Sequence, residues 1–400
     1  MRHNADVNPA EDFYKGRKIL HLCAVDFTAR HFLAPTAFDQ KKRGAIVGII
    51  CCNGPDYNFL EEQGMKMIPL AIPRSLSPLK LIRESQKLRE ILIHEKPDIL
   101  HVHTPIAGLL GRLIGKISGV KTILYTVHGF TFHENSTRIS WLLHFSIEWF
   151  FSFFHTAIIC VSAEDARTAK RTKFQAPGGI SCVPNGVDPE NYAAPNAEVL
   201  QCLRAELGVQ PEQRVVAFFG RINHEKGTRE FVEAAVAVCQ QFPDVVALLV
   251  GPTLNSEREH VLDDLSWLIA EHGMEERIRF TGYRHDVPKL LYACEVFCLP
   301  SWREGFPVTV LEAMMTGRAI VATKIRGIRE MIRNEQEGLL VPIKNSTALA
   351  EALTRLLSDS DLATQLGKQA QVRAVANYTL ALQLQRTKKV YKKILGRKRS

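Results

Sequence analysis

The chain has no hydrophobic run that is typical of a membrane span. Its most apolar window, Ile139–Ala157, is barely long enough and contains His144, Glu148 and His155, so we expect a helix that leads into a strand there. Residues 1–18 are polar and lack the apolar core of a secretory signal, and export by that route is not expected.

The cysteine spacings of a disulfide framework or a zinc ribbon are also missing. The nine cysteines lie mostly inside apolar runs, where a thiol behaves as a small buried hydrophobe. This usage fits a reducing cytoplasm.

Neither the glycine fingerprint of dinucleotide-binding domains nor a P-loop is present, so nicotinamide chemistry and ATP hydrolysis are not supported. The formal charge of +9 is concentrated in residues 1–192 and 386–400, and the latter hold eight basic residues and no acid. Such a tail suits an anionic surface, or is a solvated helix end. Because the basic residues are not interleaved with stacking aromatics, we do not expect nucleic acid as a partner.

With 400 residues, 46% of them hydrophobic, the chain is too long for one ordinary core. Short apolar runs alternate with segments of helical length and period, which predicts an α/β fold with two doubly wound, Rossmann-like domains. The expected boundaries are 1–195 for an N-terminal domain and 210–376 for a C-terminal domain. Residues 377–400 are expected to form a helix that crosses back to the first domain.

The patterns predict individual elements as well. The expected strands are Ile19–Ala24, Ala45–Cys51, Asp98–Val102, Thr122–Thr126, Thr156–Val161, Ile180–Val183, Arg214–Phe219, Val245–Val250, Ile278–Thr281, Val296–Leu299, Ile320–Ala322 and Leu339–Val341. The expected helices are Leu79–Glu95, Ala107–Ser118, Ile139–Phe154, Ala163–Arg171, Thr228–Gln241, Val308–Gly317 and Leu362–Leu395, the last with a break near 377–379.

Two glutamates, Glu304 and Glu312, stand eight positions apart in the most informative stretch, Arg303–Glu312. Glu304 falls in a strand-to-helix loop and Glu312 inside the following helix. Eight residues are slightly more than two helical turns, so both carboxylates can face one crevice at the carboxyl edge of a parallel sheet. The alternative is one exposed acid at a helix start and one on a helix face.

Two cations, Arg221 and Lys226, lie in the glycine-bounded segment Gly220–Gly227, directly before an expected helix. A helix N-terminus with two adjacent cations has the charge and geometry of a pyrophosphate site. The alternative is a solvated pair of surface residues.

Histidines follow two strands of the first domain. His128, before Gly129, is a candidate hydrogen-bond donor at the end of a strand. His101 and His103 are expected on alternate sides of their strand and therefore not to chelate a metal together. Asp359-Ser360-Asp361 lies in a turn between helices, where capping is favoured over metal binding.

Six motifs, taken in order, resemble the retaining nucleotide-sugar glycosyltransferases of the GT-B fold, in the family marked by two glutamates eight positions apart (glycosyltransferase family 4, glycosyl transferases group 1). The resemblance covers residues 18–395. Within the family, His103–Pro105, Ala107–Arg112 and Tyr125–Phe130 look most similar to CapM-like capsular and exopolysaccharide glycosyltransferases. The six motifs are His128-Gly129, Pro184–Asp188, Gly220–Gly227, Thr281–Tyr283, Glu304–Glu312 and Glu337–Pro342.

The resemblance implies a role for each matching residue. Arg221 and Lys226 would hold the donor diphosphate, Glu312 would bind the ribose and Glu304 would bind the donor sugar. His128 would reach the sugar or its phosphate from the first domain. The implied catalytic set is His128, Glu304, Arg221 and Lys226. The implied donor-binding set is Gly220, Arg221, Lys226, Gly282, Tyr283, Glu304, Gly305, Phe306, Pro307, Val308, Leu311 and Glu312.

The implied reaction moves a sugar, with retention at the anomeric carbon, from a nucleoside-diphosphate sugar such as a UDP-sugar to a saccharide on a polyprenyl diphosphate. Such lipid-linked acceptors serve capsule, exopolysaccharide or O-antigen-type glycan synthesis. Neither a cofactor nor a metal is implied, because the cations and a helix dipole offset the leaving-group charge. No residue is an obvious nucleophile, so the leaving phosphate would act as base on the front face. The enzyme would be cytoplasmic and peripheral at the inner face of the plasma membrane.

One segment departs from the family pattern. The loop expected at Val25–Phe32 lacks the paired glycines that approach donor and acceptor in many relatives, which leaves Arg30 and His103 as acceptor-binding candidates. Two other functions stay open: a sugar-nucleotide epimerase or phosphorylase of the same fold, and a catalytically silent partner protein.

Overall fold

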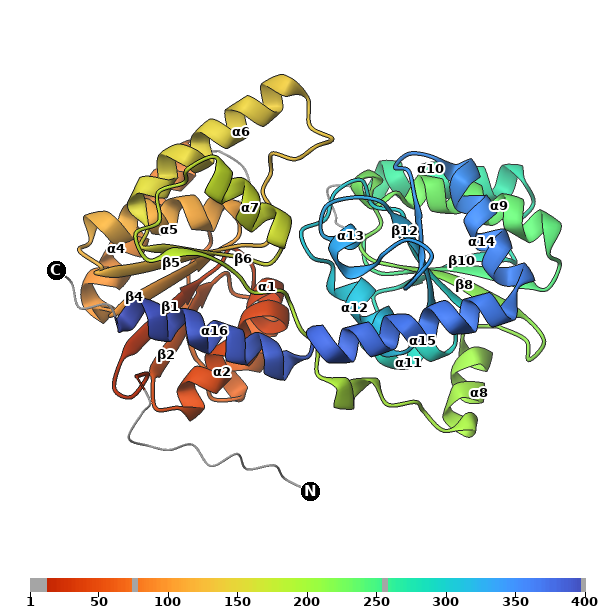
Figure 1. Ribbon diagram of the computed structural model, residues 1–400, viewed down its shortest axis with the longest axis horizontal. Helices are drawn as coiled ribbons and strands as arrows, with labels where there is room; N and C mark the ends of the chain where they lie inside the picture. The colour runs from red at the N-terminus through yellow and green to blue at the C-terminus, as the bar shows by residue number, and fades with distance from the viewer. Residues whose placement is uncertain (1–12, 74–77, 254–257, 397–400) are drawn as a thin grey trace. The chain divides into compact units, whose positions relative to one another are not determined.

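A computed structural model of the chain describes residues 13–73, 78–253 and 258–396. It consists of two compact units (Figure 1), of which unit 1 comprises Met1–Pro184 with Gln383–Ser400 and unit 2 comprises Asn185–Leu382. Each unit is a parallel sheet with helices on both faces. The predicted α/β class with two doubly wound domains is confirmed.

The sheet of unit 1 has seven parallel strands in the order β3-β2-β1-β4-β5-β6-β7. Sequence patterns missed β3, a four-residue edge strand that carries a lysine and a proline, residues typical of edges rather than of buried strands. The strands are β1 (Lys18–Leu22), β2 (Ile46–Cys51), β3 (Lys66–Pro69), β4 (Ile99–His103), β5 (Thr122–Val127), β6 (Ala157–Cys160) and β7 (Gly179–Cys182).

Helices cover both faces of this sheet with separate apolar cores. One core holds side chains from α2, α3 and α16, and the other holds side chains from α4, α5 and α7, with part of α6 packed against it. The helical elements are α1 (Asp26–Thr28), the π-helical η2 (Ala29–Leu33), α2 (Ala34–Lys42), α3 (Pro55–Glu62), α4 (Pro78–Glu95), α5 (Pro105–Ile117), α6 (Arg138–Phe151), the 3₁₀ turn η3 (Ser152–Phe154), α7 (Ala163–Arg171) and α16 (Leu380–Leu395).

The loop expected at Val25–Phe32 is helical instead, because α1, η2 and α2 follow one another without interruption. Asp26 occupies the first turn, where an acidic side chain is favourable. Its Oδ2 also accepts a hydrogen bond from the Asp56 amide at 3.1 Å, which ties the turn to α3. The missing glycines are therefore a consequence of a helical path.

The sheet of unit 2 has six parallel strands in the order β10-β9-β8-β11-β12-β13. Its strands are β8 (Arg214–Phe219), β9 (Val245–Val250), β10 (Ile278–Gly282), β11 (Val296–Leu299), β12 (Ala319–Thr323) and β13 (Leu339–Val341). Its helical elements are η4 (Pro189–Tyr192), α8 (Ala197–Glu206), η5 (His224–Lys226), α9 (Thr228–Gln241), α10 (Arg258–Glu271), α11 (Val287–Tyr292), α12 (Val308–Met315), α13 (Ile328–Met331), α14 (Ser346–Ser358) and α15 (Ser360–Asn377).

Unit 2 begins at Asn185, earlier than the domain boundary predicted at residue 195. The Asn185 side chain donates to the Phe306 carbonyl at 2.9 Å, and Val187 forms a β-bridge with Thr379. These contacts make the segment part of unit 2. The chain has therefore already changed units ten residues before the predicted end of the first domain.

The C-terminal helix α16 returns to unit 1 after the break between α15 and α16. Val390, Tyr391 and Ile394 belong to the core beneath it, and the Tyr391 hydroxyl lies 2.8 Å from His101 Nδ1. Asp359 caps α15 by accepting from the Leu362 amide at 2.9 Å, as predicted for this acidic turn.

The sequence expectations about membrane spans and cysteines can be compared with the structure. Within the described ranges, no helix combines the length and the apolarity needed to cross a bilayer. All nine cysteines lie in those ranges and are free thiols.

Gly227 provides a sharp test of the packing in unit 2. It has φ +70°, and a Cβ there would lie 2.1 Å from the Pro300 carbonyl oxygen, whereas Gly273 has φ +62° and open space around it. Gly273→Ala should cost about 1–2 kcal/mol for the left-handed backbone alone. Gly227→Ala should cost about 2 kcal/mol more, because backbone must move. Calorimetric melting of both variants checks this, and equal losses would contradict it.

Candidate active site

Two loops of unit 2 meet because β8 and β11 are parallel neighbours. The strand order reverses between these strands, and α/β sheets bind ligands at such a switch point. The loop after β8 is Gly220–Gly227 and the loop after β11 is Pro300–Pro307. The Trp302 amide donates to the Glu225 carbonyl at 2.9 Å, which joins the two loops directly.

Lys226 and Glu304, one from each loop, form an ion pair between Nζ and Oε1. Ser301 Oγ donates to the same Oε1 at 2.8 Å, and the Asn223 side chain accepts from the Lys226 amide at 3.0 Å. The second carboxylate oxygen of Glu304 has no partner among the described residues. The arrangement holds the carboxylate in place and leaves one oxygen for a ligand.

The other predicted phosphate ligand, Arg221, is exposed and makes no ion pair within the described ranges. It directly follows Gly220 at the carboxyl end of β8. Gly282 and Tyr283 end β10 at the same sheet edge, where Gly282 has φ +69° and the Tyr283 ring is 46% exposed. All four residues therefore lie along the edge where the two loops meet.

Glu312 lies in α12 and has a separate environment. Burial raises the pKa of its carboxyl to about 7, and a hydrogen bond from the Tyr192 hydroxyl, at 2.8 Å from Oε1, acts in the opposite direction. Tyr192 is itself held, because the Tyr292 hydroxyl donates to its carbonyl at 2.7 Å. Glu304 and Glu312 thus have different partners and do not share a proton as a hydrolytic dyad would.

The start of α12 is built from buried residues. Pro307 is its N-cap and no side chain caps it, which leaves amide donors at a helix N-terminus. The Phe306 ring is buried, with its centroid 5.3 Å from that of Tyr378, while Gly305 and Val308 are only partly buried. The side chain of Leu311 is fully buried. Of this residue, predicted to contact the sugar nucleotide, only the backbone is available for that contact.

Four histidines cluster at the carboxyl ends of β1, β4 and β5 in unit 1. The expectation that His101 and His103 lie on alternate sides of β4 is wrong, because residues two apart in a strand share a face. Their ring centroids are 4.2 Å apart. Together with His21 they place one nitrogen each within 4.8 Å of one another.

The ring nitrogens of this cluster have partners without a metal. His21 Nε2 contacts Gln40 Oε1 at 2.8 Å, and His21 Nδ1 lies 3.3 Å from His103 Nε2. His103 Nδ1 lies 3.4 Å from His128 Nε2. His101 contacts the hydroxyls of Tyr391 and Thr126. The Gln40 amide and the rings of His21, His103 and His128, in this order, form what we term the imidazole chain.

The imidazole chain is neutral. Burial lowers the pKa of His21 and of His128 to about 4, and it lowers the pKa of His103 well below its usual value. His103 was a candidate for binding the acceptor saccharide. It is buried between two other rings, so its imidazole does not present a nitrogen to that substrate. The other acceptor candidate, Arg30, pairs with Asp56 at 2.7 Å and covers the Phe59 ring at 3.9 Å.

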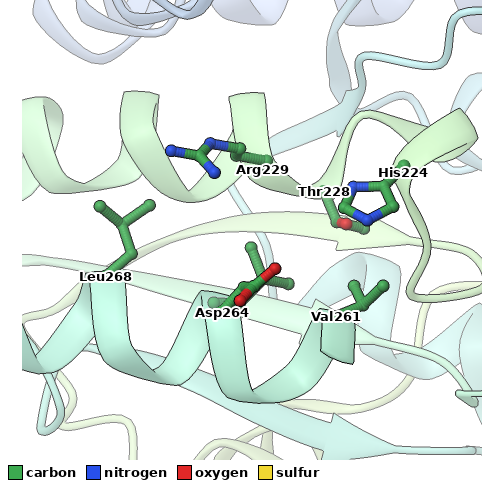
Figure 2. A pocket seen from close by; sticks show the side chains of 7 residues that line it. His224, Thr228, Arg229, Val261, Asp264 and Leu268 are labelled. Atoms are coloured by element: carbon green, nitrogen blue, oxygen red, sulfur yellow. The ribbon is translucent and has the colours of Figure 1, made fainter. Parts of the chain in front are cut away.

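A shallow hollow lies between α9 and α10 (Figure 2). Arg229, on its rim, already pairs with Glu233 at 2.9 Å. None of the predicted site residues lines the hollow, so we do not assign it to the active site. Its lining consists of His224, Thr228, Arg229, Val261, Asp264, Leu265 and Leu268.

Two family models match the chain, one described as glycosyl transferases group 1 over residues 201–373 and one as glycosyltransferase family 4 over residues 37–191. The chain belongs to this glycosyltransferase family. It is 28% identical over 349 residues (86% of this chain, 88% of the relative) to the UDP-Gal:alpha-D-GlcNAc-diphosphoundecaprenol alpha-1,3-galactosyltransferase of Escherichia coli. It is 27% identical over 371 residues (89% and 90%) to a phosphatidyl-myo-inositol mannosyltransferase of Mycobacterium tuberculosis (strain ATCC 25618 / H37Rv).

The fold of this glycosyltransferase is GT-B, as the resemblance implied. The solved structure of Anabaena Alr3699/HepE in complex with UDP and glucose matches with a TM-score of 0.81 and 22% identity, over 94% of this chain and 99% of that one. This likeness concerns the fold.

Three supporting residues were missed by sequence analysis of the site. Ser301 holds Glu304, Tyr192 holds Glu312, and Asn185 holds the Phe306 carbonyl. Asn185 lies inside a motif that carries the resemblance, and Ser301 stands three residues before another, so their positions were visible without their roles. Tyr192 stands at the start of a polar stretch, and nothing in its spacing pointed to a glutamate 120 residues later.

The pKa of Glu312 predicts a pH-dependent affinity for a nucleoside-diphosphate sugar. If the ribose donates its hydroxyls to a carboxylate, binding requires the ionised form, which rises from roughly a tenth to nine-tenths of the protein between pH 6 and 8 for a pKa of about 7. We expect affinity to increase roughly tenfold over this range. Calorimetric titration checks this, and Glu312→Gln should abolish the dependence. Tyr192→Phe should move the midpoint to higher pH.

The stability of the unliganded protein should change with pH in the opposite direction to the affinity. Because the folded state binds the Glu312 proton more tightly than the unfolded state, this group makes stability fall as pH rises from about 4.5 to about 7.

A pH-independent affinity of the wild-type protein for the nucleoside-diphosphate sugar would contradict the assignment of Glu312 to the ribose.

The imidazole chain predicts a single tautomer for His128. If Gln40 Oε1 accepts from His21 Nε2, then His103 and His128 also carry their protons on Nε2, and His128 Nδ1 is left as an acceptor. ¹⁵N NMR of histidine-labelled protein should show neutral His128 with this tautomer down to about pH 5. Gln40→Glu should preserve it and Gln40→Leu should mix the tautomers. A proton on His128 Nδ1 would mean that the hydrogen bonds of the imidazole chain run in the opposite direction. His128 would then be the hydrogen-bond donor expected from the sequence.

Proposed function

We propose that this glycosyltransferase transfers a sugar from a UDP-sugar, with retention at the anomeric carbon, to a saccharide carried on a polyprenyl diphosphate at an anionic membrane surface. The product would serve capsule, exopolysaccharide or O-antigen-type glycan synthesis. The observation that carries the proposal is the contact between the loops after β8 and β11, which sets a partly buried cation-carboxylate pair beside an exposed arginine.

The parts of this site suit the parts of a donor. Lys226 Nζ, with three protons, can keep its contact with Glu304 and bind a diphosphate oxygen, and Arg221 supplies a second charge. The free oxygen of Glu304 can accept from sugar hydroxyls. The uncapped start of α12 offers amides and a helix dipole to developing negative charge. Neither a metal nor a cofactor enters the proposal.

The relatives support the choice of donor and acceptor. The Escherichia coli relative is named for a UDP-sugar donor and a diphosphoundecaprenol acceptor, and the Mycobacterium tuberculosis relative is named for a phosphatidyl-myo-inositol acceptor. Both named acceptors are lipids that carry phosphate. We propose the same class of acceptor here, with departure on the front face and the leaving phosphate as base, and with His128 as a further contact to the donor.

A screen of nucleoside-diphosphate sugars with lipid-diphosphate-linked saccharides tests the proposal. We expect product from a UDP-sugar only, with the anomeric configuration of the donor in the NMR spectrum. Lys226→Ala should lower kcat/KM at least about 100-fold, as removal of a charge-stabilising donor does. Lys368→Ala, at an exposed position on α15, should match the wild type, and circular dichroism checks the fold of both.

Other outcomes would decide against the proposal. An epimerised sugar nucleotide without transfer would identify an epimerase, and phosphate-dependent cleavage a phosphorylase. Unchanged activity in Lys226→Ala would remove the site. A covalent glycosyl adduct on Glu304 would overturn front-face departure.

A further inference from the structure

The outer side of α6 carries a row of exposed apolar side chains, with exposed Ser146 near its middle. Ile139 is 83% exposed, and Leu142, Leu143 and Phe150 are each more than half exposed. Leu142 and Leu143 follow Ile139 after three and four residues, and Phe150 follows Leu143 after seven, so all four lie on one helical face. We call this row the α6 stripe; its members are Ile139, Leu142, Leu143, Trp149 and Phe150 of α6 and Phe153 of the following turn η3.

Buried contacts on the inner side fix the rotation of α6. Arg112, which is fully buried, pairs with Glu148 at 2.8 Å, and the Tyr125 hydroxyl donates to the same carboxylate at 3.1 Å. Trp141 and Phe145 pack against the core. Because breaking a buried ion pair costs several kcal/mol, α6 cannot turn the stripe inward. These apolar side chains are therefore exposed as a consequence of the fold.

The surroundings of the stripe are basic. The one acid of α6, Glu148, is buried in the pair with Arg112, and Arg138 is exposed at the helix start. Helices α4 and α6 both contact α5 and lie on the same face of the sheet (Figure 1). The exposed side chains of α4 include Leu79, Ile82, Lys80, Arg83, Lys87, Arg89 and a single acid, Glu90.

We propose that the α6 stripe inserts into the headgroup region of an anionic lipid bilayer, with the basic residues of α4 on the lipid phosphates. A helix of 14 residues, roughly 21 Å long, with apolar side chains on one face and cations nearby, suits a position in the plane of the interface. A second copy of the chain is a poorer occupant, because pairing two such faces brings like charges together. The proposal rests on the proposed function for its lipid-linked acceptor.

The basic tail, for which the resemblance implied an anionic membrane as partner, is less suited to insertion, and its residues 397–400 lie outside the described ranges. The apolar side chains Val390, Tyr391 and Ile394 of α16 are part of the core of unit 1. Lys389, Lys392 and Lys393 of this helix are exposed, so α16 can add electrostatic attraction but no apolar anchor.

Vesicle sedimentation with the full chain tests the α6 stripe. We expect binding to vesicles of equal parts phosphatidylglycerol and phosphatidylcholine, and binding at least tenfold weaker for the double variant Leu143→Gln/Phe150→Gln. The matched control is Val372→Gln/Val375→Gln, which changes two exposed apolar residues of α15 and should bind as the wild type does. Brominated lipid should quench Trp149 fluorescence, identified by difference from Trp149→Phe.

Three results would overturn the proposal: equal vesicle binding by wild type and stripe variant, a wild-type dimer that the stripe variant converts to monomer, or an unquenched Trp149. Activity separates this proposal from the proposed function. With a short-chain acceptor in detergent-free buffer, the stripe variant should transfer sugar at the wild-type rate. Vesicle binding without any transferase activity would retain the membrane surface and reject the proposed function.

Discussion

The parallel pairing of β8 with β11 is the constraint on which the candidate active site depends. It lays the two loops side by side at the switch point of the sheet, although 78 residues separate Lys226 from Glu304. Each loop is then held by backbone: Trp302 to Glu225, and Gly227 against the Pro300 carbonyl. The charges of the site are therefore positioned by the sheet register, and the side chains need little ordering when a ligand arrives.

Unit 1 uses the same principle with uncharged groups. The pairing of β1, β4 and β5 stacks His21, His103 and His128 into the imidazole chain, in which each ring orients the next. Buried polar groups are costly unless they are satisfied. Both ring nitrogens of His21 and of His103 meet this condition, and the imidazole chain transmits the orientation of the Gln40 amide to a histidine at the sheet edge.

Much of the fold could be predicted because buried parallel strands are continuous apolar runs. The predicted bounds of β8, β9, β11, β13, α7 and α9 agree with the structure. Prediction failed where position depends on tertiary contacts: edge strand β3, the helical path after Val25 and the unit boundary at Asn185. In the site, motif residues were visible from their spacing, but Tyr192 was not, because its partner lies in another element. The prediction that His101 and His103 lie on opposite sides of their strand was wrong for another reason. Residues two apart in a strand share a face, so the spacing in the sequence already predicts the observed arrangement.

The return of α16 to unit 1 has a consequence for synthesis of the chain. The groove that Val390, Tyr391 and Ile394 fill is part of one of the two cores of unit 1, and Tyr391 also contacts a buried histidine of β4. On the ribosome, unit 2 is complete in sequence before the last helix of unit 1 has emerged. The first unit to be translated is thus the last to be finished, and until then the part of its apolar core beneath α16 is uncovered and can be held by a chaperone.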